Sequence, residues 1–482
     1  MSKKITIEPV TRVEGHGKVT IFMDNQNHVK DTRLHIVEFR GFERFIQGRP
    51  YWEAPVLVQR LCGICPVSHH LAAAKAMDDL VGVGTNLTPV SEKMRRLMHY
   101  GQIFQSHVLH FFHLSSPDFL FGIDGDPAIR NIIGVAENNK ELAFQGIMMR
   151  KYGQEIILHT AGKKIHGTGA IPGGINKNLS LDEKELLLNG EDPLNADKMI
   201  EWSLGALEFF KNYHKENAIQ VDNFAKFPSN YMSLVRKDGA MDLYHGVLRA
   251  IDAEGKRILN DIDYHDYTNY IEEEVKTWSY MKFPYLKYLG KESGWYRVGP
   301  LARLNVCDFI PTPLAQKAFE DFKSYTMGKP NHMTLHYHWA RLIEILHSAE
   351  VIKDLLMDPD LQSTNLTTSG KKQYEGIGVI EAPRGTLIHH YQINEDDLIS
   401  KANLIVSTTH NNEPMNRSVN ETAHAFMDGN AQITEPMMNA VEVAIRAYDP
   451  CLSCATHALG QMPLEITVKG ENNEIMDYRI KE

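Results

Sequence analysis

The sequence predicts a mainly α-helical protein, with a large helical-bundle core and small peripheral β-sheets, built as one domain over residues 1–457. Two long stretches repeat apolar residues at helical spacing. Alternating apolar and polar residues, typical of strands, concentrate in the first 45 residues. The chain has 482 residues, of which 43% are hydrophobic and 23% charged, so it can bury a large core without internal repeats or linkers.

The β-rich part is expected within residues 1–45. Residues 18–23 and 29–37 both alternate in polarity, and they flank the turn-forming sequence Asp-Asn-Gln-Asn at 24–27. Two such runs joined by a short polar turn predict a β-hairpin.

Residues 60–450 are predicted to be mostly helical. Ser68 is a candidate N-cap for a helix reaching Leu80, which is rich in strong helix formers. Thr88 and Pro89 form an N-cap and N1 pair that begins a second helix, expected to end near Leu114. Its apolar seam has the spacing of a helix bundle: Met94, Leu97, Gly101, Phe104, Val108 and Phe111.

Two further helices are expected toward the C-terminal end. Residues 335–356 repeat the same apolar spacing, and residues 434–448 form another candidate helix. The second should end before Asp449-Pro450, because proline disfavours helix in the residue before it.

Composition excludes several classes of function. The net charge of −10 offers no basic surface for nucleic acid. No window reaches the roughly 20 apolar residues of a membrane span, and the N-terminus has no apolar signal core. Five cysteines are too few for a disulfide framework in a chain of 482 residues, and their spacing favours metal binding. We therefore expect a cytoplasmic protein.

Two Cys-x-x-Cys pairs near opposite ends of the chain carry the main functional signal: Cys62 with Cys65, and Cys451 with Cys454. Four thiolates arranged in this way can close around a soft metal, and structural zinc is the commonest reading of two such pairs. However, a chain of this length can bury a large core and does not need a structural zinc ion to fold. The first pair leads into a predicted helix, whose N-terminal dipole stabilises thiolates.

The other cysteine and a row of histidines invite simpler readings. Cys307 has no partner in sequence and is expected to be an inert, buried residue. His107, His110 and His113 share one helix face, but no further ligand pattern accompanies them. They are expected to be core or interface histidines rather than a metal site.

Five separated motifs extend the cysteine signal. They are Arg-Val-Glu-Gly-His at 12–16, Glu-Phe-Arg-Gly-Phe-Glu at 38–43, Arg-Leu-Cys-Gly-Ile-Cys at 60–65, Glu-Ala-Pro-Arg-Gly at 381–385 and Asp-Pro-Cys-Leu-Ser-Cys-Ala-Thr-His at 449–457. In this order, and over essentially the full length, the chain resembles the large subunit of nickel–iron hydrogenases. The resemblance implies that fold and reversible heterolytic cleavage of H2.

The resemblance also implies a metal cofactor. All four thiolates would bind nickel, with Cys62 and Cys451 terminal. Cys65 and Cys454 would bridge to an iron that carries CO and cyanide. Soft thiolate ligands suit both metals.

A magnesium ion and a set of residues around the cofactor are implied in the same way. Glu43, His457 and the carbonyl of Leu404 would bind Mg²⁺. His69 would donate to a bridging sulfur, and the Thr408 hydroxyl would bind a cyanide. The cofactor would further be surrounded by Pro383 and Asp449. The family more often has Pro and Trp where this chain has Ser407 and His410, which weakens the assignments of Thr408 and Leu404.

The proton released from H2 has two candidate acceptors in this reading. One is a terminal thiolate, Cys451, and the other is the side chain of Arg384. Arginine is almost never neutral, which favours the thiolate. Glu14 would then carry the proton outward. Asp118 and Asp449 are the candidate ion-pair partners of Arg384 beside the metals.

The electrons must leave through other subunits. No cysteines remain for an iron–sulfur relay, and no complete phosphate-binding glycine motif is present. The resemblance therefore implies an Fe–S-bearing small subunit, together with flavin and Fe–S diaphorase subunits that carry FMN and NAD. Residues 38–48, 278–285 and 451–463 resemble cytoplasmic hydrogenases coupled to NAD(P), parts of which electron-bifurcating and viologen-reducing enzymes share.

Residues 458–482 resemble an extension that a maturation endopeptidase removes, with cleavage after His457. The alternatives are a viologen-reducing hydrogenase, an H2-sensing hydrogenase and a zinc-stapled structural subunit. Sensors typically lack the removable extension. The related quinone-site subunit of respiratory NADH dehydrogenase lacks the cysteine pairs.

Overall fold

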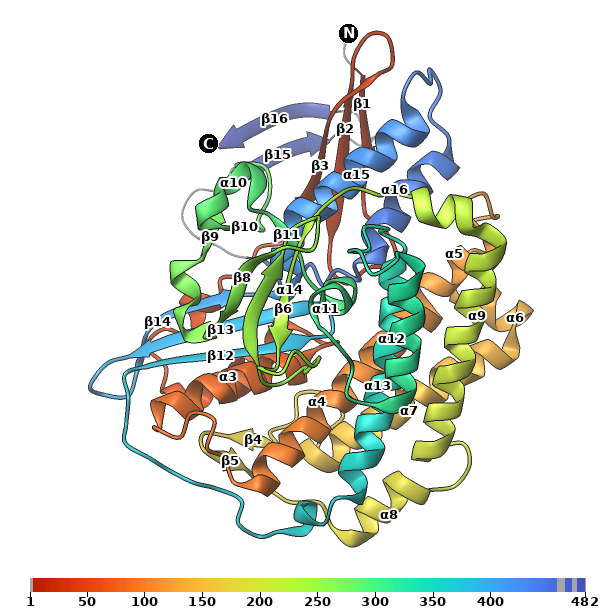
Figure 1. Cartoon of the computed structure of the whole chain (residues 1–482). Coiled ribbons are helices and arrows are strands. Elements are labelled where there is room, and N and C mark those ends of the chain that lie inside the picture. The colour runs from red at the N-terminus through yellow and green to blue at the C-terminus, as the bar shows by residue number, and fades with distance from the viewer. Residues whose placement is uncertain (1–2, 457–463, 470–474, 482) are drawn as a thin grey trace.

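Figure 1 shows a computed structural model of the chain, which describes residues 3–456, 464–469 and 475–481. Long helices form the body of the molecule: α4 (Pro89–Leu109), α7 (Lys140–Ala161), α9 (Ala196–Asn223) and α13 (His336–Met357). Helix α4 packs on α7 and on α13, and α13 also packs on α9. The predicted helical-bundle core is confirmed.

The other helices are shorter and cover this bundle and the sheets. They are α1 (Phe42–Ile46), α2 (Ala54–Leu57), α3 (Pro66–Leu80), α5 (Ser116–Phe121), α6 (Ile132–Asn138), α8 (Leu181–Asn189), α10 (Gly290–Ser293), α11 (Pro300–Val306), α12 (Pro313–Tyr325), α14 (Ser407–His410), α15 (Asn412–Met427) and α16 (Glu435–Ala447).

The strands form several small sheets. Among the described residues, two sheets have three strands, one has four, and the other strands form two-stranded pairs. Neighbouring strands are antiparallel, except that β11 pairs with β6 in parallel. The strands are β1 (Lys3–Ile7), β2 (Gly17–Met23), β3 (Val29–Ile36), β4 (Ala170–Ile171), β5 (Gly174–Ile175), β6 (Asn230–Val235), β7 (Val247–Ile251), β8 (Arg257–Ile262), β9 (Ile271–Glu274), β10 (Phe283–Leu286), β11 (Tyr296–Arg297), β12 (Glu375–Ala382), β13 (Gly385–Ile393), β14 (Ile399–Ile405), β15 (Leu464–Lys469) and β16 (Ile475–Lys481).

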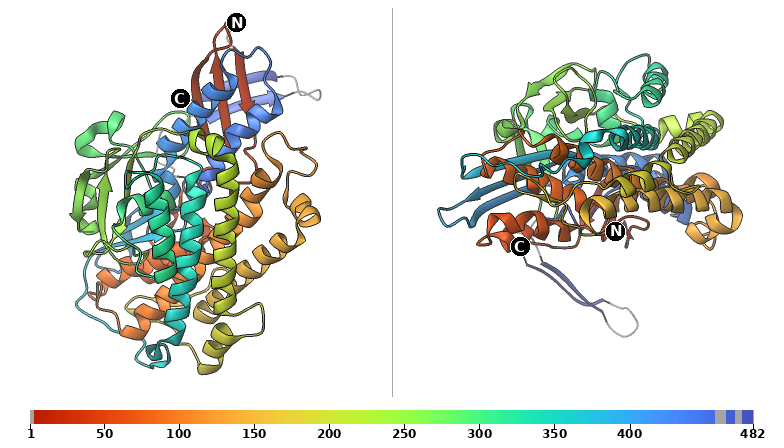
Figure 2. Two further views of the ribbon diagram at one scale, coloured as in Figure 1. Left: turned by 45° about the vertical axis from the view of Figure 1, so that its right-hand side comes forward. Right: turned by 90° about the horizontal axis from the view of Figure 1, so that it is seen from below.

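The predicted N-terminal hairpin is present as β2 and β3, and β1 adds a third strand along β2. Their inward-facing side chains join the main core, including Val19, Ile21 and Leu34. The C-terminal pair β15–β16 extends away from the body in Figure 2. Among the described residues, no helix combines the length and hydropathy needed to span a lipid bilayer.

Helix α4 begins where the sequence predicts. The Thr88 hydroxyl accepts a hydrogen bond from the amide of Ser91 at 3.3 Å, and Pro89 is the first helical residue. All six residues of the predicted seam are buried. Gly101 allows close contact with α7, since a Cβ there would lie 2.7 Å from Cγ2 of Ile156. Beyond Leu109 the chain continues as a π-helical segment, His110–Ser115.

The predicted cap of α3 is wrong. The helix begins at Pro66, and Ser68 lies buried within it. Proline at the first position sets the helical φ angle, so the start moves upstream of the predicted one. As a result Cys65 occupies the N-cap position, directly at the N-terminus of the helix.

The sheet β12–β13–β14 packs against α3 and positions the turn that carries Arg384. Two glycines of β12 allow the helix and the strand to meet at backbone distance. A Cβ on Gly378 would lie 2.0 Å from the carbonyl oxygen of Ala72, and one on Gly376 would lie 2.0 Å from that of Ala76. Neither backbone atom can move without shifting α3.

Replacing Gly378 by alanine is expected to separate β12 from α3 and to destabilise the protein. Overpacking of this kind typically costs about 1–3 kcal/mol. The measurement is the thermal midpoint of unfolding of the purified protein by calorimetry. Gly205→Ala is the matched control, because Gly205 lies exposed in α9 with nothing within 4 Å of its Cβ position. It should gain about 0.5–1 kcal/mol; equal midpoints for the two variants would contradict the packing argument.

Candidate metal centre

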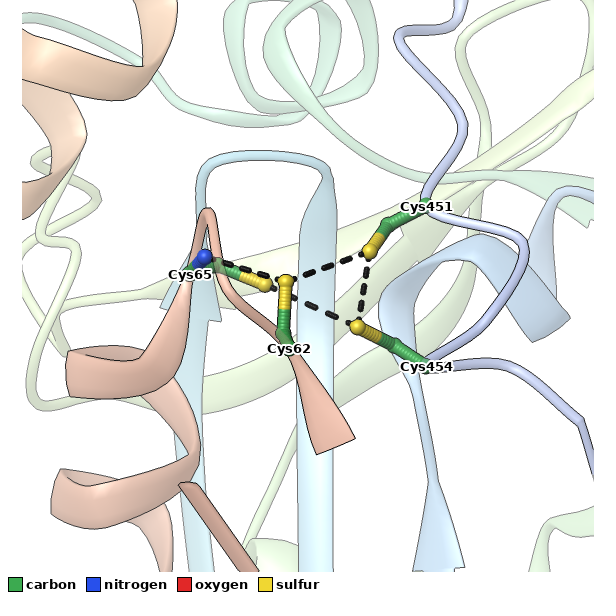
Figure 3. A group of neighbouring side chains, drawn as sticks. All are labelled: Cys62, Cys65, Cys451 and Cys454. Atoms are coloured by element: carbon green, nitrogen blue, oxygen red, sulfur yellow. Dashed lines mark hydrogen bonds between the residues drawn. The ribbon is translucent and has the colours of Figure 1, made fainter. Parts of the chain in front are cut away.

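The two cysteine pairs lie on two loops that meet in the interior. Cys62 and Cys65 follow a short 3-10 helix (Val58–Leu61) and lead into α3. Cys451 and Cys454 follow the end of α16. Figure 3 shows the four sulfur atoms pointing toward one another from opposite sides.

All four sulfur atoms lie within 4.8 Å of one another. The Sγ atoms of Cys62 and Cys451 are 3.3 Å apart, those of Cys65 and Cys454 are 3.9 Å apart, and those of Cys451 and Cys454 are 2.7 Å apart. Each of these cysteines is at most 5% exposed. Buried sulfur atoms at these separations form a ligand set for a soft metal.

The N-terminal segment contributes a carboxylate to this centre. Glu14 pairs with Cys451 as an isolated parallel β-bridge, and its carbonyl accepts the amide of Leu452 at 2.9 Å. Its Oε2 atom accepts hydrogen bonds from the Cys451 thiol at 3.0 Å and from the Ser453 amide at 3.1 Å. A proton acceptor therefore touches one of the four sulfur atoms.

Arg384 also lies beside the thiols, in the turn between β12 and β13. Its guanidinium donates to the carbonyl of Asp449 and, at 3.0 Å, to the Oδ1 atom of Asp449. Its Nη1 atom is buried and has no hydrogen-bond partner within the described residues. Such a group is costly unless something accepts its hydrogen bonds.

A small cavity opens between Arg384 and the thiols. It is lined by Cys65, Ser68, His69, Ala382, Pro383, Arg384, Leu387, Val406, Ser407, Thr408 and Cys451. Thr408 accepts the amide of Cys451 through Oγ1 at 3.0 Å, and it can still donate its hydroxyl proton into the cavity. His69 is oriented by His389, at 3.1 Å between Nδ1 and Nε2.

Burial and hydrogen bonding shift the pKa values of the thiols in opposite directions. Burial raises the pKa of Cys451 and of Cys454 well above the usual value. Hydrogen bonds from the other three thiols, together with one from His69, lower the pKa of Cys65 well below it. The amides of Ile64 and Cys65 donate to the sulfur of Cys62 at 3.2 and 3.1 Å. Four thiolates can coexist here when a cation compensates their charge.

Comparison with known proteins decides the family. A sequence profile described as nickel-dependent hydrogenase matches residues 40–124 and 215–457, and one described as HoxL-like matches residues 4–39. The chain belongs to the nickel-dependent hydrogenase family. The beta subunit of the NAD-reducing hydrogenase HoxS of Cupriavidus necator is 54% identical, covering 100% of both chains.

Two further comparisons support the same family. A component of the F420-non-reducing hydrogenase of Methanothermobacter thermautotrophicus is 43% identical over 95% of each chain. A chain in the crystal structure of an NAD⁺-reducing [NiFe]-hydrogenase in the H2-reduced state is 55% identical in sequence. It superposes with a TM-score of 0.91, covering 94% of this chain and 99% of that one. The predicted hydrogenase large-subunit fold and the oxidoreductase class are confirmed.

One predicted contact of this hydrogenase subunit is wrong. Asp118 does not pair with Arg384. Its carboxylate lies between three other guanidinium groups, those of Arg12, Arg130 and Arg446. Coulombic attraction from these groups overcomes burial and lowers the pKa of Asp118. Asp449 is the partner of Arg384 in its place.

The residues expected to bind magnesium are partly described. Glu43 is buried, and its Oε1 atom accepts the amide of Leu404 at 3.1 Å, so the two residues lie together. His457 lies outside the described residues.

Two residues next to the thiols were not predicted from the sequence. Ser453 lies inside the second cysteine pair, and its hydroxyl donates to the Oε2 atom of Glu38 at 2.8 Å. A serine between two cysteines does not by itself indicate a functional role. Glu38 is only the first residue of the motif at 38–43, and nothing in that motif indicates a contact with Ser453. The contact between them spans the two ends of the chain, so no local pattern reveals it.

His214, Asp222 and His336 form a second cluster of residue types that can bind metal, but hydrogen bonds among them account for their arrangement. Asp222 lies 2.8 Å from Nε2 of His214 and 3.1 Å from Nε2 of His336. The Asn331 side chain accepts the amide of Met333 through oxygen and therefore donates to Nδ1 of His336, at 2.8 Å. Nε2 of His336 then carries the proton and donates to Asp222, so its lone pair is not available to a metal.

Two histidines of the predicted row and the fifth cysteine have structural roles, as expected. His107 contacts Glu344 at 2.8 Å, and His110 contacts the carbonyl of Arg446 at 2.7 Å. Burial raises the pKa of Cys307 to about 12, so its thiol stays protonated and unreactive.

Proposed function

We propose that this chain is the catalytic subunit of an NAD-reducing [NiFe] hydrogenase, which cleaves H2 heterolytically and passes the electrons to partner subunits. The observation that carries the proposal is the convergence of four buried thiols, within 4.8 Å, beside one carboxylate and one guanidinium. The acceptor is inferred from the NAD-reducing relative that is 54% identical over the full length.

The thiols would hold nickel, with Cys65 and Cys454 also bridging to an iron that carries CO and cyanide. The surroundings fit this cofactor, because a small cavity beside the thiols is lined by donors for iron ligands. These donors are the hydroxyl of Thr408 and the Nη1 atom of Arg384, which has no partner among the described residues. Pro383 supplies an apolar wall. When bound, the bimetallic group polarises H2 and takes up its two electrons.

The proton is handled by this chain's own side chains. Burial opposes the charged form of Arg384, but Asp449 and the thiolates outweigh it and raise its pKa further. Arg384 therefore stays a cation, orients the cavity and is no proton acceptor. The sulfur of Cys451 takes the proton and passes it to Glu14, at 3.0 Å. Asp449 fixes the guanidinium in place.

A magnesium ion would bind at Glu43, the carbonyl of Leu404 and His457. The proximity of Glu43 and Leu404 supports this, and carboxylate and carbonyl oxygens are preferred magnesium ligands. Residues 1–457 would form the mature domain, and residues 458–482 would be removed by a maturation endopeptidase. The intact mass of the metal-loaded chain tests this, since retention of the full sequence would contradict the cleavage.

The electrons would leave through an Fe–S-bearing small subunit, followed by flavin and Fe–S diaphorase subunits, in the cytoplasm. Exposed apolar side chains in the segment that leads to the first cysteine pair support the contact with the small subunit. They are Val37, Phe39, Phe45, Trp52 and Val56.

The test is H2-dependent reduction of NAD by the complex purified with its native partners. The proposal expects NADH to form from H2 at a rate comparable to that with an artificial viologen acceptor. Reduction of viologen alone would favour the alternative of a viologen-reducing hydrogenase. Signalling without turnover would favour a sensor, and zinc without nickel would favour a structural subunit.

A further inference from the structure

A row of polar side chains leads from the thiols to the protein surface. Glu14 touches both the Cys451 thiol and the Ser453 amide. The Ser453 hydroxyl donates to Oε2 of Glu38 at 2.8 Å. The other oxygen of Glu38 contacts Nδ1 of His16, whose side chain is 68% exposed. These four residues thus lie in contact from a buried sulfur to solvent, and the contact between Glu14 and Ser453 is made through the serine amide.

The backbone is shaped to bring these groups together. Gly15 has a φ of +84°, which favours glycine. A Cβ at this position would lie 2.7 Å from the amide nitrogen of Ser453 and 2.8 Å from its Oγ. Glycine therefore lets the segment between Glu14 and His16 lie directly against Ser453. Both carboxylates then meet the same serine, one at its amide and the other at its hydroxyl.

We propose that Ser453, Glu38 and His16 form the outer half of the proton path between Glu14 and solvent. This inference rests on the proposed role of Glu14. Glu14 is held against this serine at its amide, so a rotation of the protonated carboxyl brings its proton to the Ser453 hydroxyl as the hydroxyl proton moves to Glu38. At rest His16 donates its Nδ1 proton to the Glu38 carboxylate, so the exposed ring turns to present its unprotonated nitrogen to the protonated Glu38. That nitrogen takes the proton, and the imidazolium releases its other proton to water. Each group returns to its starting charge, and the reverse sequence supplies protons for H2 formation.

The groups around Glu38 keep its carboxylate ionised, as a proton carrier requires. Its carboxylate faces His16, the Ser453 hydroxyl and Arg40, whose Nη2 atom lies 3.8 Å away. Partial burial works to raise the pKa of Glu38, but the hydrogen bonds from His16 and Ser453 outweigh it and lower the pKa. Glu38 is therefore ionised at neutral pH and ready to accept a proton.

A simple ion pair would behave differently. A His–Glu ion pair that makes no contact beside the thiols contributes little to stability and nothing to turnover. His390, which is buried, and Glu375, which is exposed, form a His–Glu pair of this kind at 2.7 Å, on β13 and β12. The pair of His16 and Glu38 differs because its carboxylate also contacts the serine beside the thiols. Glu375→Gln is therefore the matched control for Glu38→Gln.

The test measures exchange of D2 with water protons by the assembled enzyme, which needs no electron acceptor. Glu38→Gln keeps the hydrogen-bonding shape but cannot carry a proton, so HD and H2 formation should fall by roughly tenfold or more. Infrared bands of the metal-bound CO and cyanide should stay unchanged. Glu38→Asp should recover part of the exchange, and added imidazole should rescue His16→Ala. Glu375→Gln should exchange like the unaltered enzyme.

The outcomes separate this path from the role of Glu14. If Glu14→Gln blocks exchange while Glu38→Gln exchanges normally, the outer path runs elsewhere and the inference is overturned. If neither substitution affects exchange, the proposed role of Glu14 fails as well. If Glu38→Gln alters the infrared bands, Glu38 acts on the structure of the centre and not as a carrier. A pH-independent loss that imidazole does not rescue in His16→Ala would also contradict the path.

Discussion

Replacing Cys451 by serine is expected to abolish hydrogen activation. The Cys451 sulfur lies 3.3 Å from that of Cys62, 2.7 Å from that of Cys454 and 3.0 Å from the Glu14 carboxylate, so we propose that it binds the metals and also takes the proton. A serine hydroxyl is a hard ligand with a much higher pKa, and it binds soft metals poorly. The loss should exceed the roughly 10–100-fold typical when a supporting residue of a metal site is removed.

The measurements are the nickel and iron content and the H2-dependent activity of the assembled enzyme. Cys307→Ser is the matched control, since Cys307 is also buried but lies outside the sulfur cluster. It should retain both metals and its activity, with only a loss of stability. A Cys451→Ser enzyme that still binds nickel and turns over would show that this sulfur is not a ligand.

Replacing Glu14 by glutamine should give an enzyme that is loaded with metal but turns over slowly. The amide can still accept the hydrogen bonds from Cys451 and Ser453, so the local structure should survive. It cannot carry a proton, and loss of such a group typically lowers rates by about 10²–10⁴-fold. The checks are turnover with H2 and the infrared spectrum of the metal ligands.

Glu8→Gln provides the comparison, because Glu8 lies in the same N-terminal segment but its side chain is 54% exposed and pairs with Lys18. This variant should match the unaltered enzyme. Normal turnover of Glu14→Gln would mean that the proton leaves the thiols by another route.

The helices were predictable where capping and apolar spacing agree. Thr88 and Pro89 mark the start of α4, and its seam is buried as expected. The strands β12 and β13 were missed because nearly all their residues are buried, which removes the alternation that identifies a strand. The start of α3 was misplaced because Ser68 is a good capping residue that the packed structure does not use.

The residues of the candidate site that lie in recognisable sequence motifs were predictable, but their contacts with distant segments were not. The four cysteines were found from the sequence and from the resemblance, and Asp449 was one of two candidate partners for Arg384. The wrong pairing of Asp118 has an electrostatic cause, since three other guanidinium groups compete for this carboxylate. The contact of Ser453 with Glu38 depends on how the two chain ends fold together, which no single segment encodes.

X-ray absorption at the nickel edge, with metal analysis of the purified complex, tests the central claim most directly. The claim is that sulfur atoms from both chain ends bind one bimetallic cofactor. It predicts one nickel and one iron per chain, with nickel surrounded by four sulfur neighbours and a nearby iron. Stoichiometric zinc without nickel, or nickel bound mainly by nitrogen and oxygen, would contradict it.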